Sequence, residues 1–401
     1  MRSVSGRTEL LAGADARPIT PALDPARPVY LAGFQNDRRA TGIDADLEVR
    51  TLALAARGGR VFVLAVCDLV GVLRSDTLQI RASVTDLDAD VVVAATHTHS
   101  GPDTIGLWGP DQTTRGVDED YLAEVRATVV DSIRAAVTAL EPARVFAATT
   151  RVQGVVQNYR DPHVLDDAVG VLAFDRPDAG GPIATLVNVG VHPEVLDGDS
   201  TLISPDMAGA CRASVDVARG GITVWASGDL GGMQSPAEGP RTPEEVRRKG
   251  GALAGAAVEA LIDAPPLTAS LVRYRSGKVA LPLWNPMYRV GLETGLLRGD
   301  VHPDGTLTTE IGLLDLGGAR IAFWPGEVLP KLGLACKTAL HTPHPFLVGL
   351  ANDELGYILA REDFVEPADW DDPGAQYEES MSVGPETGPI LEAALGILLP
   401  R

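Results

Sequence analysis

Short apolar runs alternate with longer amphipathic segments along the chain, a pattern typical of α/β proteins. The apolar runs are rich in Val and Ile, as expected for strands that are covered on both faces. They predict strands over Val61–Val66, Val91–Ala95, Arg144–Thr149, Val169–Phe174, Ile183–Val189, Ile222–Ala226, Arg320–Trp324 and Phe346–Leu350. The amphipathic segments predict helices over Arg74–Thr85, Asp118–Leu140, Asp206–Ala218, Pro243–Ile262, Val328–Ala339 and Thr387–Leu398.

The chain shows no internal repeat, low-complexity tract or obvious linker. We therefore predict a single α/β domain over residues 1–401, built as a layered mixed sheet with covering helices. The segment Pro282–Thr309 contains Gly and Pro but few apolar runs, which makes it the best candidate for an insertion or a lid.

Composition alone limits the classes of partner and function that this protein can have. The 401 residues include 34 Lys and Arg against 54 Asp and Glu, a net charge of −20, which disfavours nucleic acid or an anionic membrane as the main partner. No stretch approaches the roughly 20 apolar residues of a membrane span, and no apolar run of signal-peptide length begins the chain. The three cysteines have no C-x-x-C spacing. We expect a cytoplasmic protein that acts on a small molecule, in an oligomeric state that the sequence leaves open.

Two of the seven histidines lie in the string T-H-T-H-S-G-P at Thr96–Pro102, directly after the predicted strand Val91–Ala95. Residues i and i+2 of an extended segment point to the same side, so His97 and His99 can face one point at the carboxyl end of a strand. Open α/β sheets place their ligands at this end, and a His-x-His pair presents two neutral nitrogens to Zn²⁺. The alternative is that both rings only hydrogen-bond to loops; the position favours a site.

The same pattern recurs at the ends of later strands. His192 follows an apolar run, and Glu327 follows the predicted strand Arg320–Trp324 through a Pro-Gly turn. Two histidines and one carboxylate form a ligand set for catalytic zinc that leaves a position open for water. Glu327 could instead face the positive end of a helix dipole. Tyr357, after a further predicted strand, could reach the site as a ligand or oxyanion donor, or be an ordinary exposed loop residue.

Together, these motifs resemble the neutral/alkaline (non-lysosomal) ceramidase family, specifically its N-terminal catalytic domain. The resemblance rests on the T-H-T-H string and on supporting matches that extend over nearly the whole chain, at Ala12–Pro21, Leu31–Phe34, Asn188–His192, Leu202–Asp206, Pro325–Glu327, Asn352–Tyr357 and Tyr377–Ser382. It implies a zinc-dependent amide hydrolase. No part of the chain matches the immunoglobulin-like domain that follows in ceramidases, and no signal sequence is evident, so we expect the catalytic domain alone.

The resemblance also implies a role for individual residues. It implies that the zinc ligands are His97, His192, Glu327 and Tyr357. It places His99 beside the metal in a catalytic role, and Arg160 near the substrate carbonyl. Arg160 and Tyr357 would then donate hydrogen bonds to the developing oxyanion.

One family motif departs from its usual form in this chain. The string Gly-Asp-Val-Ser-Pro, whose serine is often assigned as a nucleophile, corresponds here to Gly228–Pro236, and Ser235 aligns only across a three-residue insertion. We therefore interpret Ser235 as a loop serine before proline rather than a nucleophile. Asp229, in the same string, could orient a metal ligand.

The expected reaction is hydrolysis of a C–N amide bond through a metal-activated water. The acidic charge, the aromatic content of 5% and the lack of a basic amphipathic helix favour a substrate that is smaller and more polar than ceramide. Three alternatives remain: an esterase, lactonase or acyl-transfer (cyclising) enzyme with the same zinc site, a true ceramidase, and a binding protein that has lost catalysis.

Overall fold

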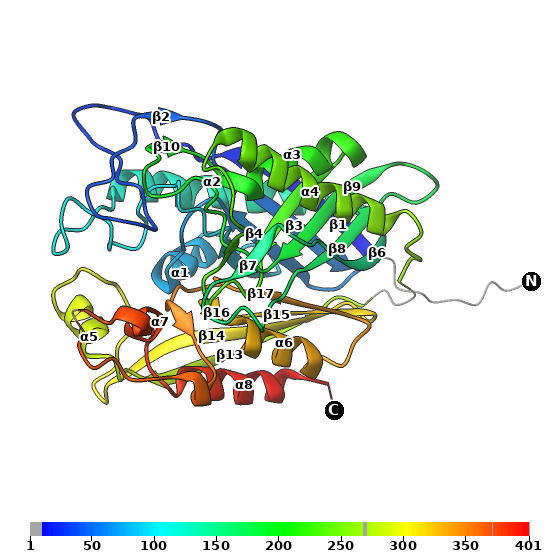
Figure 1. Cartoon of the computed structure of the whole chain (residues 1–401). Coiled ribbons are helices and arrows are strands. Elements are labelled where there is room, and N and C mark those ends of the chain that lie inside the picture. Colours follow the sequence, from blue (N-terminus) through cyan, green and yellow to red (C-terminus); the bar gives the residue numbers. More distant parts are fainter. Residues whose placement is uncertain (1–9, 268–270, 371, 401) are drawn as a thin grey trace, which may run out of the picture.

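The computed structural model describes residues 10–267, 271–370 and 372–400. Two β-sheets pack face to face, and helices cover the outer face of each, which gives four layers (Figure 1). The larger sheet has eight strands in the order β11 (Ile222–Ser227), β9 (Pro182–Val189), β8 (Ala168–Asp175), β6 (Glu141–Arg151), β1 (Leu10–Pro18), β3 (Glu48–Ala56), β4 (Val61–Cys67) and β5 (Ala89–Ala95). The smaller sheet has the order β13 (Arg273–Pro282), β14 (Thr306–Asp315), β15 (Ala319–Phe323) and β17 (His344–Val348).

Both sheets are mixed. The pairs β4–β5, β9–β11 and β15–β17 are parallel, and the other neighbours within the two sheets are antiparallel. Short two-residue or three-residue pairs complete the strand set: β2 (Gly42–Ile43) with β10 (Leu202–Ile203), β7 (Val156–Asn158) with β12 (Gln234–Pro236), and β16 (Glu327–Val328) with β18 (Tyr357–Ile358).

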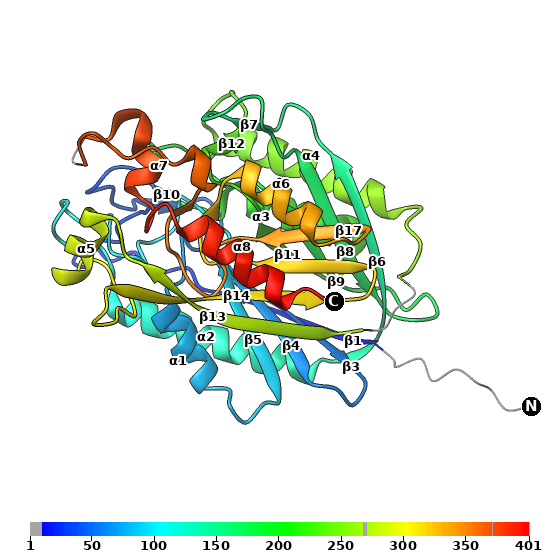
Figure 2. The ribbon, with the colours of Figure 1, turned by 90° about the horizontal axis from the view of Figure 1, so that it is seen from below.

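The helices divide between the two outer faces. On the larger sheet lie α2 (Glu119–Thr138), α3 (Asp206–Arg219) and α4 (Pro243–Leu261), with α1 (Arg74–Ala82) against β5. Figure 2 shows α6 (Pro330–Ala339) and α8 (Thr387–Leu398) over the smaller sheet. The remaining helices are α5 (Pro286–Glu293), α7 (Tyr377–Ser380) and the 3₁₀ turns η1 (Arg361–Asp363) and η2 (Gly374–Gln376). None of the helices in the described residues is long and apolar enough to cross a bilayer.

Burial on both faces explains the near-continuous apolar strands. In β4, Phe62 and Leu64 point into the core between the two sheets, where they meet Phe323 of the smaller sheet. The alternate residues Val63 and Ala65 belong to the core under α2. Both sets are buried, so the strand shows no polar alternation. The predicted mixed α/β fold with covering helices is confirmed.

The larger sheet is folded so strongly that its two edge strands approach each other at their carboxyl ends. Ser227, at the end of β11, donates from Oγ to the carbonyl of Thr96, which directly follows β5, at 2.7 Å. The loop after β17 connects both edges, because Gly349 N–H donates to the Ser227 carbonyl at 3.0 Å and Asn352 N–H donates to the Val93 carbonyl at 2.7 Å. The ends of β5, β9, β15 and β17 therefore meet in one region.

Candidate metal centre and pocket

His97, His99 and His192 meet where these strands end. Their ring centroids are 4.9–5.4 Å apart, and one nitrogen from each ring lies within 4.8 Å of the other two. All three side chains are buried. Glu327 in β16 adds a carboxylate, with Oε2 3.0 Å from His192 Nε2 and 3.4 Å from His97 Nε2. The structure therefore brings together the two histidines and the carboxylate that the strand-end pattern indicated.

The rings of His97 and His192 are oriented so that a nitrogen lone pair of each faces the carboxylate of Glu327, an arrangement that a cation between them would stabilise. His97 Nδ1 lies 2.5 Å from the carbonyl oxygen of Val70, and His192 Nδ1 lies 3.1 Å from that of Gln234. A carbonyl oxygen only accepts, so each Nδ1 carries the hydrogen and each Nε2 of a neutral ring presents a lone pair to Glu327. Ligand atoms of a tetrahedral zinc ion with bonds of about 2.0–2.1 Å lie about 3.3 Å apart, which these spacings fit.

The charges of these groups lead to the same conclusion. Burial acts to lower the pKa of His192, but the hydrogen bond to Glu327 and the nearby carboxylates outweigh it and raise the pKa to about 9. Despite burial, the two histidines hold the pKa of Glu327 below its usual range. The site thus favours a positive charge between these side chains, either as a proton or as a metal ion, and could hold a metal.

His99 differs from the other two histidines in its partner. Its Nδ1 lies 3.0 Å from Oε2 of Glu194, and the edge of its ring meets Phe34 with centroids 5.0 Å apart. Burial lowers the pKa of His99 to about 4, although Glu194 opposes this effect. A neutral ring with its hydrogen on Nδ1 leaves Nε2 free to accept a proton or to bind a metal.

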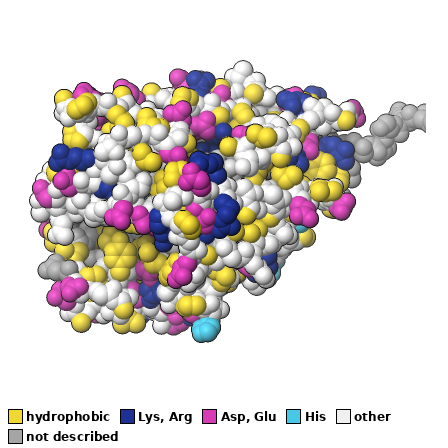
Figure 3. Space-filling view, turned by 45° about the horizontal axis from the view of Figure 1, so that its top comes forward, with side chains coloured by type: hydrophobic (Ala, Val, Ile, Leu, Met, Phe, Trp, Pro, Cys, Tyr) yellow, Lys and Arg dark blue, Asp and Glu magenta, His cyan; other side chains and the backbone are white. Residues whose placement is uncertain are grey.

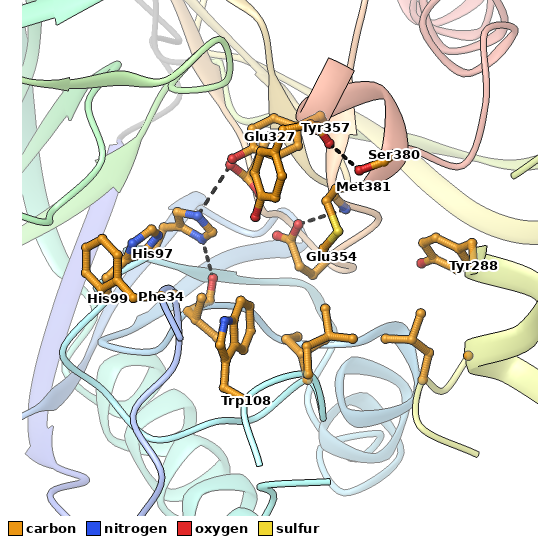
Figure 4. Close-up of a pocket in the computed structure, with 18 of the residues that line it drawn as sticks. Phe34, His97, His99, Trp108, Tyr288, Glu327, Glu354, Tyr357, Ser380 and Met381 are labelled. Atoms are coloured by element: carbon orange, nitrogen blue, oxygen red, sulfur yellow. Dashed lines mark hydrogen bonds and ion pairs between the residues drawn. The ribbon is translucent and has the colours of Figure 1, made fainter. Parts of the chain in front are cut away.

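Tyr357 is set beside Glu327 by strand pairing. The two residues are register partners in the parallel pair β16–β18, so their side chains leave the backbone on the same side. Tyr357 is buried, and burial together with Glu327 raises the pKa of its phenol. Its hydroxyl donates to Met233 Sδ at 3.6 Å. Figure 4 shows Tyr357 and Glu327 next to each other on the same side of the pocket.

The histidine cluster borders a pocket of about 430 Å³, which His97 and His99 line. Its polar end includes His97, His99, Glu327 and Tyr357, and much of its wall is apolar, formed by Ile105, Leu107, Trp108, Met287, Leu296 and Leu297. The last three come from α5 and the loop after it, within the segment predicted as an insertion. Figure 3 shows a hollow on the left of the molecule with hydrophobic side chains gathered around it and acidic side chains at its edge.

Comparison with known proteins identifies a relative. Over 247 residues, the chain is 26% identical to the neutral ceramidase of Pseudomonas aeruginosa, a match that covers 54% of this chain and 36% of that protein. The crystal structure of neutral ceramidase from the same organism superposes with a TM-score of 0.78 over 98% of this chain and 75% of that one, at 19% identity. The chain is a distant homologue of neutral ceramidase.

A second solved structure, a ceramidase complexed with C2, gives the same TM-score of 0.78 over 98% of this chain and 76% of that chain, at 18% identity. No protein-family model matches the chain. The sequence match spans little more than a third of the curated neutral ceramidase, and the structural likeness extends the shared fold to nearly the whole chain. The resemblance to neutral ceramidase found in the sequence is therefore confirmed, and the shared architecture is that of the strands and helices described above.

Arg160, to which the ceramidase resemblance gave a place near the substrate, does not line the pocket. Its guanidinium binds Glu379 with both terminal nitrogens, at 2.7 and 3.0 Å, and also contacts Glu378. Both carboxylates belong to α7, which contributes Tyr377 and Ser380 to the pocket wall. The structure thus shows Arg160 fastening one wall of the pocket, and its role at the substrate carbonyl stays a prediction.

Asp229 and Ser235 are buried near the site without touching a histidine ring in any contact described. The carbonyl of Asp229 accepts from Gln234 Nε2 at 3.2 Å, and Gln234 in turn holds His192 through its own carbonyl. Asp229 is thus linked to His192 through Gln234 by its backbone carbonyl alone, and an orienting role for its side chain stays a prediction. Ser235 lies in β12 opposite Gln157 and does not line the pocket.

Sequence reasoning missed Glu194, which the structure places against His99. Its only signal was its position two residues after His192, where an extended chain would direct it to the same side. It also missed Glu354 and the aromatic residues Phe34 and Trp108 of the pocket. These residues lie in loops without periodicity, and although Phe34 and Glu354 fall within segments that match the ceramidase family, nothing in the local pattern marks them as pocket residues.

Proposed function

We propose that this protein is a zinc-dependent hydrolase that cleaves the C–N bond of a small amide. The observation that carries the proposal is the convergence of His97 Nε2, His192 Nε2 and Glu327 Oε2 beside a pocket that His97 and Glu327 line. Carboxylate and imidazole ligands with one position left open are the ligand set of catalytic zinc. A bound Zn²⁺ would lower the pKa of a water molecule and polarise the substrate carbonyl.

The chain's own residues supply the remaining chemistry. His97 and His192 would hold the ion through Nε2, with their Nδ1 hydrogens fixed by carbonyl oxygens. His99, held by Glu194, has a free Nε2 that would take a proton from the attacking water and return it to the leaving amine. Tyr357 would donate its hydroxyl hydrogen to the developing oxyanion or bind the ion through the same oxygen.

The pocket supports a small substrate with an apolar part. A volume of about 430 Å³ lies within the roughly 300–1,000 Å³ that is usual for small-molecule sites, towards the smaller end. Composition led us to expect a more polar substrate than this apolar wall suits. Net charge is a poor guide here, because it reflects the surface of the protein and not the lining of its pocket. A short acyl chain against Trp108 and Leu297 fits this wall.

The test combines metal analysis with a substrate panel. Purified protein should carry about one zinc per chain, and zinc-loaded protein should hydrolyse a short N-acyl amide faster, by kcat/KM, than a lactone or a detergent-solubilised ceramide. Protein that binds no metal and hydrolyses none of the panel would overturn the proposal and favour a binding protein. A lactone as best substrate would favour the esterase alternative, and ceramide as best substrate would show a true ceramidase.

A further inference from the structure

One carboxylate oxygen in the pocket has no hydrogen-bond donor among the residues that the structure describes. Glu354 lies in the loop after β17, is 8% exposed and lines the pocket. Its Oε1 accepts a hydrogen bond from Gly356 N–H at 2.9 Å, whereas its Oε2 accepts none from any residue that the structure describes. A buried acceptor without a donor costs about 1–3 kcal/mol, and more if it is charged, so this atom is suited to a donor that arrives with a ligand.

The neighbours of Glu354 show that its position is fixed. A Cβ atom on Gly71 would lie 2.7 Å from Glu354 Cγ and 3.0 Å from Ile105 Cδ1, so the absence of a side chain at residue 71 lets Glu354 pack beside the apolar wall. The preceding Asp353 is buried too, but it has donors in Arg74 N–H at 3.0 Å and Thr309 Oγ1 at 2.9 Å. Packing thus fixes the side chain of Glu354, but Glu354 lacks the side-chain hydrogen-bond donor that Asp353 has.

The charges around the pocket indicate which donor would suit Glu354. Glu194, Glu327 and Glu354 all line it, and no Lys or Arg appears among the described lining residues. Glu194 is matched by His99 and Glu327 by two histidines, which leaves Glu354 alone. Burial and the proximity of Glu327 raise the pKa of Glu354 well above its usual range. A cation at Glu354 would stabilise its charged form, because it replaces the hydration that burial removes.

In the view of Figure 4, Glu354 lies between the Glu327 end of the pocket and Tyr288 of α5. We propose that Glu354 is a specificity-determining residue that binds a primary ammonium group of the substrate, so that the enzyme selects amides carrying an amine a few atoms from the scissile bond. This inference rests on the proposed amide hydrolysis and names the substrate class of the same pocket. An ammonium supplies up to three N–H donors, and the apolar wall next to Glu354 would pack against the methylenes that carry it.

The experiment compares matched substrates. Zinc-loaded enzyme is assayed with pairs of N-acetyl amides that have the same spacer of two to six methylenes and end in either an ammonium or a hydroxyl group. With the best spacer, the ammonium substrate should have the higher kcat/KM by about 10- to 100-fold, as expected for a hydrogen bond between charged groups. In Glu354→Gln the preference should fall to a few-fold, because the Gln carbonyl can still accept from Gly356 N–H while the charge is gone.

Glu293→Gln is the matched control. Glu293 ends α5, is exposed and does not line the pocket, so this variant removes the same charge and should keep the full preference. A wild-type enzyme without ammonium preference would overturn the inference whether or not Glu354→Gln folds. So would a folded Glu354→Gln enzyme that retains the preference, or a wild type that prefers the hydroxyl partner.

A binding measurement separates this inference from the proposed function. Calorimetry with octylamine and 1-octanol needs no turnover; octylamine should bind the wild type more tightly, and Glu354→Gln should lose the difference. His97→Ala protein should keep it, which shows that the amine is not binding through a metal. If no amide is hydrolysed but octylamine binds as expected, the proposed function fails while the role of Glu354 stands; equal binding of octylamine and octanol to the wild type overturns that role.

Discussion

Gly33 lies directly against the imidazole ring of His99. A Cβ atom at residue 33 would come within 2.3 Å of His99 Cγ, and the φ angle of Gly33 is +99°, a conformation that side-chain-bearing residues rarely adopt. The loop thus needs glycine for two reasons, its backbone conformation and the space that the ring occupies. A methyl group at residue 33 should therefore displace the ring of His99, whose Nδ1 lies 3.0 Å from Glu194 Oε2.

Gly33→Ala should therefore lower kcat by about 10- to 100-fold, because a general base displaced by about 1 Å loses its alignment, while the zinc content stays near that of the wild type. Gly58→Ala is the control: Gly58 has a φ of +77°, but no atom lies within 4 Å of its Cβ position. It carries similar backbone strain without the contact. The measurement is kcat together with zinc per chain for both variants. Equal kcat values for the two would show that the position of His99 does not matter for the reaction.

The three histidines should separate into two classes on mutation. His97→Ala and His192→Ala should lose both metal and activity, because each removes an Nε2 that faces Glu327. His99→Ala should keep most of the zinc and lose about 10²–10⁴-fold in rate, as expected when a general acid or base is removed. Zinc per chain and kcat, measured on the same preparations, check the division. A metal-free His99→Ala protein would make His99 a ligand.

How much of this site the sequence could predict depends on the kind of signal each residue has. His97, His192 and Glu327 each follow an apolar strand, so an α/β pattern suffices to place each of them at the carboxyl end of a strand, although it does not show that Glu327 follows a strand of the second sheet. The pattern could not show that the larger sheet folds its edges together, which is what places the end of β5 near that of β11. The short pair that sets Tyr357 beside Glu327 is likewise a tertiary feature.

Two strands that the sequence missed, β1 and β13, lack a continuous run of large apolar residues. β13 reads RYRSGKVALP, and β1 contains small and charged residues, so neither resembles the buried strands around it. These two strands are held in their sheets by hydrogen bonds to neighbouring strands, which the pattern of their own side chains does not indicate. Arg160 illustrates a different limit, because only the folded structure shows that Glu378 and Glu379 occupy its guanidinium.

Trp108 should limit the length of the acyl chain. It lines the pocket, together with Leu107 and Leu297, so truncating it enlarges the apolar end. In Trp108→Ala, the ratio of kcat/KM for a dodecanoyl amide to that for an acetyl amide should rise by at least about 10-fold, since each accommodated methylene contributes to binding. Trp284→Ala is the control, because Trp284 is 41% exposed, packs against Phe364 and does not line the pocket. An unchanged ratio in Trp108→Ala would show that the acyl chain of the substrate does not bind against Trp108.

Lys337 neutralises two buried carboxylates close to the candidate metal site. Its Nζ lies 2.6 Å from Asp229 Oδ1 and also contacts Asp166, and the side chains of both carboxylates are almost fully buried. The backbone carbonyl of Asp229 accepts a hydrogen bond from Gln234 Nε2 at 3.2 Å, and the carbonyl of Gln234 faces His192 Nδ1, so the cluster lies next to a residue that positions His192.

Replacing Lys337 with Met leaves both carboxylates buried without a cation, and the free energy of unfolding should fall by about 3–5 kcal/mol. Lys331→Met provides the comparison on the same helix, α6: Lys331 pairs with Glu362 and Asp363 but is 47% exposed, so its loss should cost at most about 1 kcal/mol. Adding Asp229→Asn to Lys337→Met should recover part of the loss, because it removes one of the uncompensated charges. Urea denaturation of zinc-loaded protein measures all three. If Lys337→Met costs no more than Lys331→Met, the buried cluster does not stabilise the fold, and its link to His192 through Gln234 would have to be tested by zinc affinity alone.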